Sequence, residues 1–222
     1  MSEVEQKPHR ITIPRYTLGE ELISSISHGV GALLGVAALV LCIVRGAIAG
    51  DAWKVVSGII FGATLIILYT MSCLYHALKV NRAKRVFRVI DHCTIFLLIA
   101  GTYTPYTLVS LRETVGWWVF GIIWAAAVLG IVMNAISLKK FARLSVALYL
   151  VMGWMIVFAY QHMVNAVPQS GMTLLILGGV AYTVGSILYG IGSKIKYFHS
   201  VFHFFCLIGS ALHFFSIYLY VL

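Results

Sequence analysis

Seven long apolar stretches dominate this sequence, and each is long enough to cross a lipid bilayer as an α-helix. The hydrocarbon core of a bilayer is about 30 Å thick, which an α-helix of about 20 residues spans. The stretches cover residues 22–46, 53–78, 89–110, 116–137, 143–163, 172–192 and 198–221. Because a chain in lipid must satisfy its backbone hydrogen bonds internally, the pattern predicts an all-α membrane protein with a bundle of seven transmembrane helices.

The composition excludes a soluble fold of this size. Of the 222 residues, 61% are hydrophobic and 10% are charged, whereas about a quarter are charged in an ordinary soluble domain. We therefore expect one membrane domain, residues 22–222, after a short polar segment, residues 1–21, that lacks the features of a removable signal peptide. In that segment, Thr17 and Glu20 have the spacing of a capping box, which predicts the start of a helix.

Basic residues are unevenly distributed among the predicted loops. If the N-terminus is cytoplasmic, the cytoplasmic segments hold all of the 16 Lys and Arg residues except Arg45, Lys54 and Arg112. Cytoplasmic loops retain basic residues, so we expect the N-terminus in the cytoplasm and the C-terminus outside, in an inner membrane. Orientation in the membrane also explains the net charge of +9. No nucleic-acid partner is therefore expected.

Polar residues of three predicted spans lie at one depth in the membrane. Counted from the basic residues that end these spans, His76, Asp91 and His199 lie about three residues, or 5 Å, inside the cytoplasmic boundary. Ser72 and His203 lie about seven residues, or 10 Å, inside it. Asp91 is the only acidic residue within a predicted span. Ionisable side chains in a bilayer are costly, so this layer is the candidate functional site.

The histidines of this layer have the spacing of a metal site. His199 and His203 are four residues apart, so that one helix presents two imidazoles to one ion. With His76 as the third ligand and a water as the fourth, the set predicts an open catalytic zinc site, and Asp91 would supply negative charge nearby. Two alternatives stay open: the histidines bond to backbone carbonyl groups, or Asp91 pairs with Arg88.

Four other histidines lie within or at the edges of the spans, and one of them, His162, is near the outer end of the fifth span, too far away to reach the metal. His28 is toward the cytoplasmic side of the first span and either orients a ligand or makes a close helix contact. His92 points about 100° away from Asp91 on an ideal helix, so the two are not expected to share a partner. His213 lies about 15 Å beyond His203, too far to reach the metal.

Each of three small side chains beside the proposed ligands has two alternative roles. Cys73 and Cys206 are three residues from His76 and His203, and each is either a thiolate ligand or a small apolar filler. Ser72 either contributes to the site or bonds to its own helix backbone.

Four motifs together resemble a known family. They are Ser72-Cys73-Leu74-Tyr75-His76, Asp91-His92, Gly101-Thr102-Tyr103-Thr104-Pro105-Tyr106 and His199-Ser200-Val201-Phe202-His203. The combination resembles the hemolysin III family, the bacterial branch of the progestin and adipoQ receptors, from about residue 16 to the C-terminus. The resemblance implies a zinc ion bound by three histidines, which match His76, His199 and His203. It also implies an aspartate that holds the metal-bound water, which matches Asp91, with Ser72 nearby.

Related alkaline ceramidases suggest that the substrate is a lipid amide. The first hypothesis is a zinc-dependent intramembrane hydrolase of lipid amides or esters, with membrane lipids entering sideways between helices. Asp91 would accept the proton of the attacking water, and Ser72 would help to hold the oxyanion. Position 200 is Ser, where soluble zinc proteases have the Glu of His-Glu-x-x-His, so the base must come from another helix.

Three alternatives belong to other classes of protein. One is a receptor or sensor with structural zinc, which would need a signalling partner. Another is an ion or proton carrier, although its path should be polar through the whole membrane. The least supported is a cytolysin, because a chain built of constitutive spans lacks the soluble form of a secreted pore-former.

Overall fold

The computed structural model describes residues 13–14, 16–192 and 195–222. Throughout these ranges the regular elements are helices and there is no strand, which confirms the all-α prediction. Most of the expected N-terminal segment, residues 1–12 and 15, lies outside the described residues. The same holds for four of the basic residues used to orient the chain, namely Lys7, Arg10, Arg15 and Lys194.

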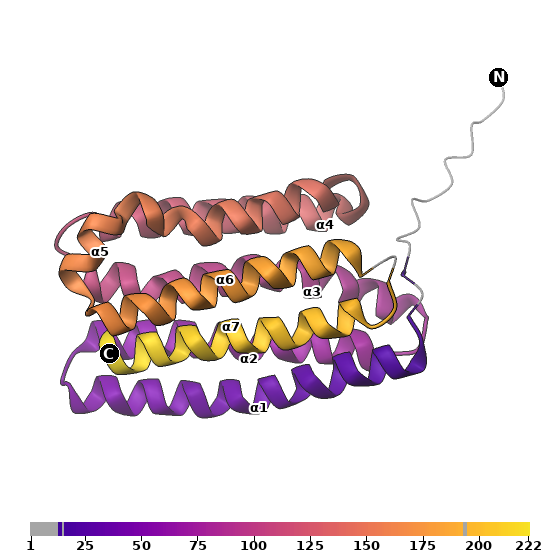
Figure 1. Cartoon of the computed structure of the whole chain (residues 1–222), viewed down its shortest axis with the longest axis horizontal. Coiled ribbons are helices and arrows are strands. Elements are labelled where there is room, and N and C mark those ends of the chain that lie inside the picture. The colour runs from indigo at the N-terminus through magenta and orange to yellow at the C-terminus, as the bar shows by residue number, and fades with distance from the viewer. Residues whose placement is uncertain (1–12, 15, 193–194) are drawn as a thin grey trace, which may run out of the picture.

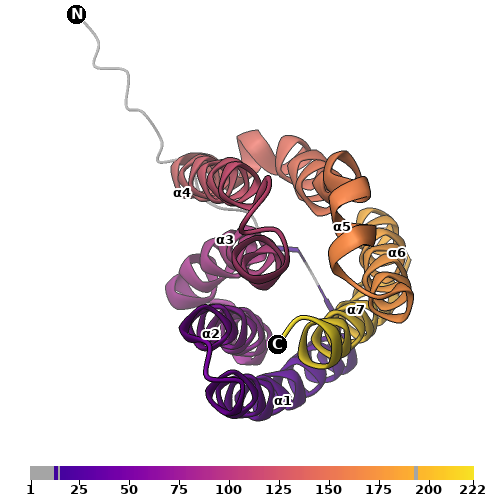
Figure 2. The ribbon, with the colours of Figure 1, turned by 90° about the vertical axis from the view of Figure 1, so that its left-hand side faces the viewer.

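Short connections join the helices. The helices are α1 (Leu18–Ile48), α2 (Ala52–Ala77), α3 (Arg82–Pro105), η1 (Tyr106–Ser110), α4 (Gly116–Trp154), η2 (Met155–Ala159), α5 (Tyr160–Ala166), α6 (Gln169–Ile191) and α7 (Phe198–Tyr220). The long helices run along one axis (Figure 1). Seen down that axis, they form a ring in which α7 returns to α1 (Figure 2).

Local sequence signals explain where two of these helices begin and end. Thr17 caps α1 through the predicted capping box, because its hydroxyl accepts from the backbone N–H of Glu20 while the Glu20 carboxylate accepts from the backbone N–H of Thr17. The α-helical part of the third span ends at Pro105, which has no N–H to donate. The chain continues beyond it as the π-helical turn η1.

α4 folds back on itself at Ser137. This residue has extended backbone angles, φ −162° and ψ 94°, inside an otherwise helical stretch. Ser145 Oγ donates to Asn134 Oδ1 at 2.6 Å, and Asn134 Nδ2 donates to the hydroxyl of Tyr149 at 3.2 Å. Residues 15 apart in a straight helix are about 22 Å apart along its axis, so these bonds require a reversal. α4 therefore consists of two antiparallel arms, whose return Figure 1 shows.

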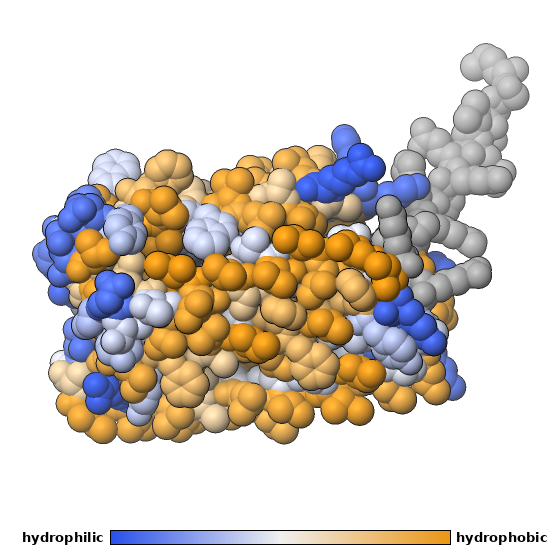
Figure 3. All heavy atoms as spheres, viewed as in Figure 1, coloured by the Kyte–Doolittle hydropathy of each residue, from blue (hydrophilic) through white to orange (hydrophobic). Residues whose placement is uncertain are grey.

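The described part of the chain contains six helical runs that are long and apolar enough to cross a membrane. They are Leu18–Ile48, Ala52–Ala77, Arg82–Ser110, Gly116–Ala166, Gln169–Ile191 and Phe198–Tyr220. The expected spans 116–137 and 143–163 fall within one run of 51 residues, and this run folds back at Ser137, the residue where the first of the two spans was expected to end. Apolar side chains cover the middle of the face in Figure 3, with hydrophilic ones at both ends. The chain is a multi-pass membrane protein.

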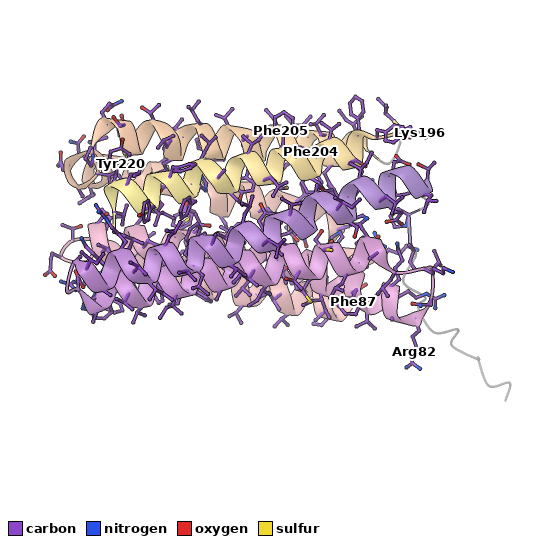
Figure 4. The ribbon with its side chains drawn as sticks, turned by 90° about the horizontal axis from the view of Figure 1, so that it is seen from below. Arg82, Phe87, Lys196, Phe204, Phe205 and Tyr220 are labelled. Atoms are coloured by element: carbon purple, nitrogen blue, oxygen red, sulfur yellow. The ribbon has the colours of Figure 1, made fainter. Side chains whose placement is uncertain are left out.

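The two ends of the bundle differ. α1 begins at one end, and the C-terminus lies at the other (Figure 1). Arg82 and Lys196 lie at the end where α1 begins, whereas Tyr220 lies at the opposite end (Figure 4). The first end therefore gathers the start of α1, the turn between α2 and α3 and the turn between α6 and α7. The proposed metal ligands lie near these turns.

Candidate metal centre

Three buried histidines converge at the end of the bundle where α1 begins. His76 lies in the last turn of α2, and His199 and His203 lie in the first two turns of α7. Nε2 of His199 is 3.4 Å from Nε2 of His76 and 3.2 Å from Nε2 of His203. The ligand atoms of all three lie within 4.8 Å of one another. The three rings thus point their Nε2 atoms at one another rather than at backbone carbonyl groups.

The spacing of these nitrogens fits a metal ion. Imidazole nitrogens bind zinc at about 2.0–2.1 Å, so two of them at a tetrahedral angle lie about 3.4 Å apart. The observed separations of 3.4 and 3.2 Å agree with this value. Three histidines leave one tetrahedral position for a water or substrate, which is the arrangement of catalytic sites. The residues present can therefore hold a metal ion.

A carboxylate behind His76 sets the protonation of its ring. Nδ1 of His76 lies 2.7 Å from Oε2 of Glu21. A carboxylate only accepts hydrogen bonds, so Nδ1 carries the proton and the lone pair of Nε2 faces the other histidines. The other oxygen of Glu21 accepts from Nζ of Lys84 at 2.6 Å, and this lysine is 2% exposed. His76 therefore has the tautomer that a metal ligand needs.

Sequence reasoning missed Glu21. It was placed in the polar segment 1–21, whereas α1 begins at Leu18 and includes it. The signal that could have found it is its spacing from His28. Residues seven apart lie on one helix face, so a carboxylate and an imidazole on α1 both face α2 and α7.

Aromatic rings surround His199. The ring of Tyr16 stacks on it with 4.5 Å between centroids and 15° between planes. Tyr189 of α6 and Phe202 of α7 approach the same ring at 5.8 and 5.6 Å. Tyr16 lies just before α1, where burial, with a smaller contribution from Tyr75, raises the pKa of its phenol well above the usual value. Tyr16 is therefore a neutral ring packed on a proposed ligand.

His28 contacts the centre from α1. It is 3% exposed, and its ring lies 3.9 Å from that of His203 and 4.9 Å from that of Tyr69. Within the described residues, neither nitrogen of His28 has a hydrogen-bond partner, and neither has Nδ1 of His203. Of its two expected roles, the structure supports a close helix contact directly against a proposed ligand.

The proposed base Asp91 lies on α3. Its side chain is 15% exposed, and Oδ2 lies 3.8 Å from Nδ1 of His92. His92 turns back along its own helix, because Nδ1 donates to the backbone oxygen of Arg88 at 2.9 Å. Nε2 of His92 accepts from the hydroxyl of Tyr189 at 3.1 Å. Both nitrogens of His92 therefore bond to groups other than the carboxylate of Asp91.

The remaining candidates lie around this centre. Ser72 is buried one turn before His76 on α2. Within the described residues, the group of converging ligand atoms contains neither Cys73 nor Cys206. His213, as expected, is elsewhere: its Nε2 donates to a backbone oxygen of α6 at 3.0 Å.

Comparison with known proteins assigns the chain to a family. A family model described as haemolysin-III related matches residues 16–214. The chain belongs to the haemolysin-III-related family. It is 42% identical over 205 residues to the Hemolysin-3 homolog of Bacillus subtilis (strain 168), which covers 92% of this chain and 96% of the relative. It is 37% identical over 203 residues to Hemolysin-3 of Bacillus cereus, which covers 91% and 92%.

More distant similarity reaches animal proteins. The monocyte to macrophage differentiation factor of Homo sapiens is 26% identical over 184 residues, or 77% of this chain and 73% of the relative. No solved structure matches the chain significantly. The haemolysin-III-related match includes the whole centre from Tyr16 to His203. It confirms the resemblance that the motifs indicated.

In this haemolysin-III-related protein the candidate metal centre adjoins a cavity of about 160 Å³. The cavity lies between α3, the second arm of α4, α6 and α7, and its lining is mostly apolar. Tyr189 and Phe202, which contact His199, form part of its wall, and so does His92. Other lining residues, Tyr106 and His213, lie deeper along the bundle. The end of the cavity nearest the three histidines is therefore formed by rings that contact His199.

Proposed function

We propose that this protein is a zinc-dependent membrane hydrolase that acts on lipid amides or esters. The observation that carries the proposal is the convergence of His76, His199 and His203, whose ligand atoms lie within 4.8 Å of one another, with Nε2 of His199 at tetrahedral spacing from Nε2 of each of the other two. Three histidine ligands with one open position are typical of catalytic zinc, whereas structural zinc sites are usually closed by four protein ligands.

The adjoining cavity supports a lipid as the substrate. Its lining is mostly apolar and begins at residues that contact His199. Ligand cavities of this kind bury apolar groups and fix them with a few polar contacts at one end. We infer that an acyl chain occupies the cavity from the membrane side and places its amide or ester group beside the histidines.

The chain's own residues divide the chemical work as follows. His76, His199 and His203 hold the metal, and Glu21 orients His76 through its Nδ1 proton. Zinc, when bound, supplies Lewis acidity toward a carbonyl oxygen.

Asp91 and Ser72 act on the reacting groups in this proposal. The carboxylate of Asp91 accepts the proton of the attacking water. The hydroxyl of Ser72 donates to the carbonyl oxygen as negative charge develops on it. Asp91 is the acidic residue of α3, and Ser72 lies one turn from His76 on α2.

We further propose seven membrane crossings, with the N-terminus in the cytoplasm and the C-terminus outside the inner membrane. The two arms of α4 then count as two crossings, and the start of α1 and the C-terminus, which lie at opposite ends of the bundle in Figure 1, support an odd number. Arg82 and Lys196 at the end where α1 begins support a cytoplasmic location for that end. The metal centre would lie in the cytoplasmic leaflet.

The direct test is metal analysis of the purified protein beside a variant with both His199→Ala and His203→Ala. We expect about one zinc per chain in the unmodified protein and none in the variant, and the matched control His162→Ala, an exposed histidine of α5, should retain zinc. A zinc content in the double variant equal to that of the unmodified protein would show that zinc does not bind at His199 and His203.

Turnover is measured on a ceramide and on a matched ester, before and after zinc is stripped and restored. Hydrolysis that is lost when zinc is stripped and returns when zinc is restored supports the proposal. Zinc binding without hydrolysis of any lipid amide or ester would instead favour a receptor in which the metal is structural.

A further inference from the structure

Tyr16 covers the metal centre from the end where α1 begins. Its ring stacks on that of His199 at 4.5 Å and lies 6.0 Å from that of His76. Tyr16 precedes α1 and lies outside the helices that are able to cross the membrane. It therefore lies between two of the proposed ligands and the aqueous side of the protein.

Hydrogen bonds at the start of α1 hold Tyr16 in place. The backbone N–H and the hydroxyl of Thr17 both donate to Oε2 of Glu20, at 2.8 and 2.7 Å. Oε1 of Glu20 accepts from the backbone N–H of Tyr197 at 2.7 Å. Tyr197 is two residues before His199. One carboxylate thus links the residue next to Tyr16 to the start of the helix that carries the ligand.

The cavity borders the same ligand from the membrane side. Tyr189 and Phe202 contact the ring of His199 and line the cavity. Within the described residues, Tyr16 is not part of that lining. A packed ring therefore covers His199 from the end where α1 begins, while the apolar cavity within the bundle is separated from the same ligand only by rings that contact it.

We propose that Tyr16 is a specificity-determining residue that closes the metal centre to water-soluble ligands and leaves it open to molecules arriving through the apolar cavity. The inference rests on the proposed function, since it requires a metal ion at the three histidines. Tyr16 acts by occupying space. A ring that blocks a path slows entry and release alike, so it changes both rates and leaves the equilibrium affinity unchanged.

The test uses the full chain in detergent micelles, loaded with zinc and challenged with the water-soluble chelator EDTA. The chelator must itself reach the centre, so the dependence of zinc loss on chelator concentration measures access. Tyr16→Ala is expected to lose zinc about tenfold faster than the unmodified protein, as a barrier lower by about 1.4 kcal/mol would produce. Its zinc Kd, measured by equilibrium competition, should not change.

Three further variants separate the blocking of the path by Tyr16, here called the lid, from other effects of a substitution. Tyr16→Phe keeps the ring and should release zinc at the unmodified rate. Tyr160→Ala removes an exposed tyrosine of α5 and should also leave the rate unchanged. Thr17→Val keeps Tyr16 but removes a hydrogen bond to Glu20, so it should accelerate release even if Tyr16→Ala does not fold.

Two results would overturn the lid while leaving the proposed function intact. One is zinc loss at the unmodified rate in both Tyr16→Ala and Thr17→Val. The other is a Kd that weakens in proportion to the faster release, because the ring would then stabilise the bound metal instead of blocking its path. Absence of zinc from the unmodified protein would overturn the proposed function and the lid together.

Discussion

Nδ1 of His76 donates a hydrogen bond to the carboxylate of Glu21 at 2.7 Å. The two residues are 55 positions apart and join α2 to the first turn of α1. Metal-binding histidines generally use their second nitrogen in this way, which fixes the ring and makes it a better ligand. The first turn of α1 thus takes part in the metal centre.

Glu21→Gln should weaken zinc binding about tenfold, within the range found when such outer partners are changed. The amide keeps the shape of the side chain, but its single oxygen serves either His76 or Lys84 and loses the charge. The measurement is the zinc Kd by competition with a chelator. Glu113→Gln, an exposed acidic residue at 85% side-chain exposure, is the matched control. Equal affinity in both variants would exclude an orienting role for Glu21.

Lys84→Met should destabilise the fold by about 1–3 kcal/mol, because it leaves the carboxylate of Glu21 without its cationic partner in a largely buried place. Nζ of Lys84 also donates to the backbone oxygen of Leu78 at 3.0 Å, and that bond is lost too. Thermal unfolding in detergent measures the change. Lys79→Met removes an exposed lysine nearby and should have little effect. A stability equal to that of Lys79→Met would contradict the prediction.

Asp91→Asn should retain zinc and lose turnover by about 10²–10⁴-fold, the usual contribution of a general base. The amide cannot accept the proton of water at neutral pH. Ser72→Ala removes a single hydrogen-bond donor and should lower kcat with zinc content unchanged. Zinc content and kcat on a ceramide-like substrate are measured together. Turnover of Asp91→Asn at the unmodified rate would eliminate Asp91 as the base.

The reversal of α4 at Ser137 makes the seven crossings testable. A cysteine at Lys140, which is exposed just after the reversal, should react with a membrane-impermeant maleimide only from the cytoplasmic side. A cysteine at Gln169, at the start of α6, should react only from outside. If the run Gly116–Ala166 crossed once, Gln169 would instead react from the cytoplasmic side. Labelling of the unmodified protein serves as the control, because it gives the background reaction of the native cysteines.

Features written locally in the sequence were predicted well. The capping box at Thr17 marked the start of α1, which begins at Leu18. The four-residue spacing of His199 and His203 implied a shared helix face, and their Nε2 atoms lie 3.2 Å apart. Counting residues from the basic ends of two spans predicted His76 at the level of these histidines, and its ligand atom lies within 4.8 Å of theirs. Hydropathy and helical periodicity carry this information without reference to the rest of the chain.

Contacts that depend on how helices rotate against one another were not predicted. For His92 only a direction on an ideal helix was predicted, and its bonds to the backbone oxygen of Arg88 and the hydroxyl of Tyr189 were not. The boundary between two spans was predicted at residue 137, but the sequence did not predict that a single residue with extended backbone, Ser137, reverses the chain there. A side-chain rotamer and a single backbone torsion leave no trace in hydropathy.

The sequence by itself determined which stretches are helical, that the chain belongs in a membrane, and which histidines share one layer. Only the tertiary structure decided that the carboxylate of Glu21 accepts a hydrogen bond from His76, and that Tyr16 packs on His199. Residue spacing describes one helix at a time. The contacts of Glu21 and Tyr16 depend on the rotation of α1, α2 and α7 about their axes, which the packing of the whole bundle sets.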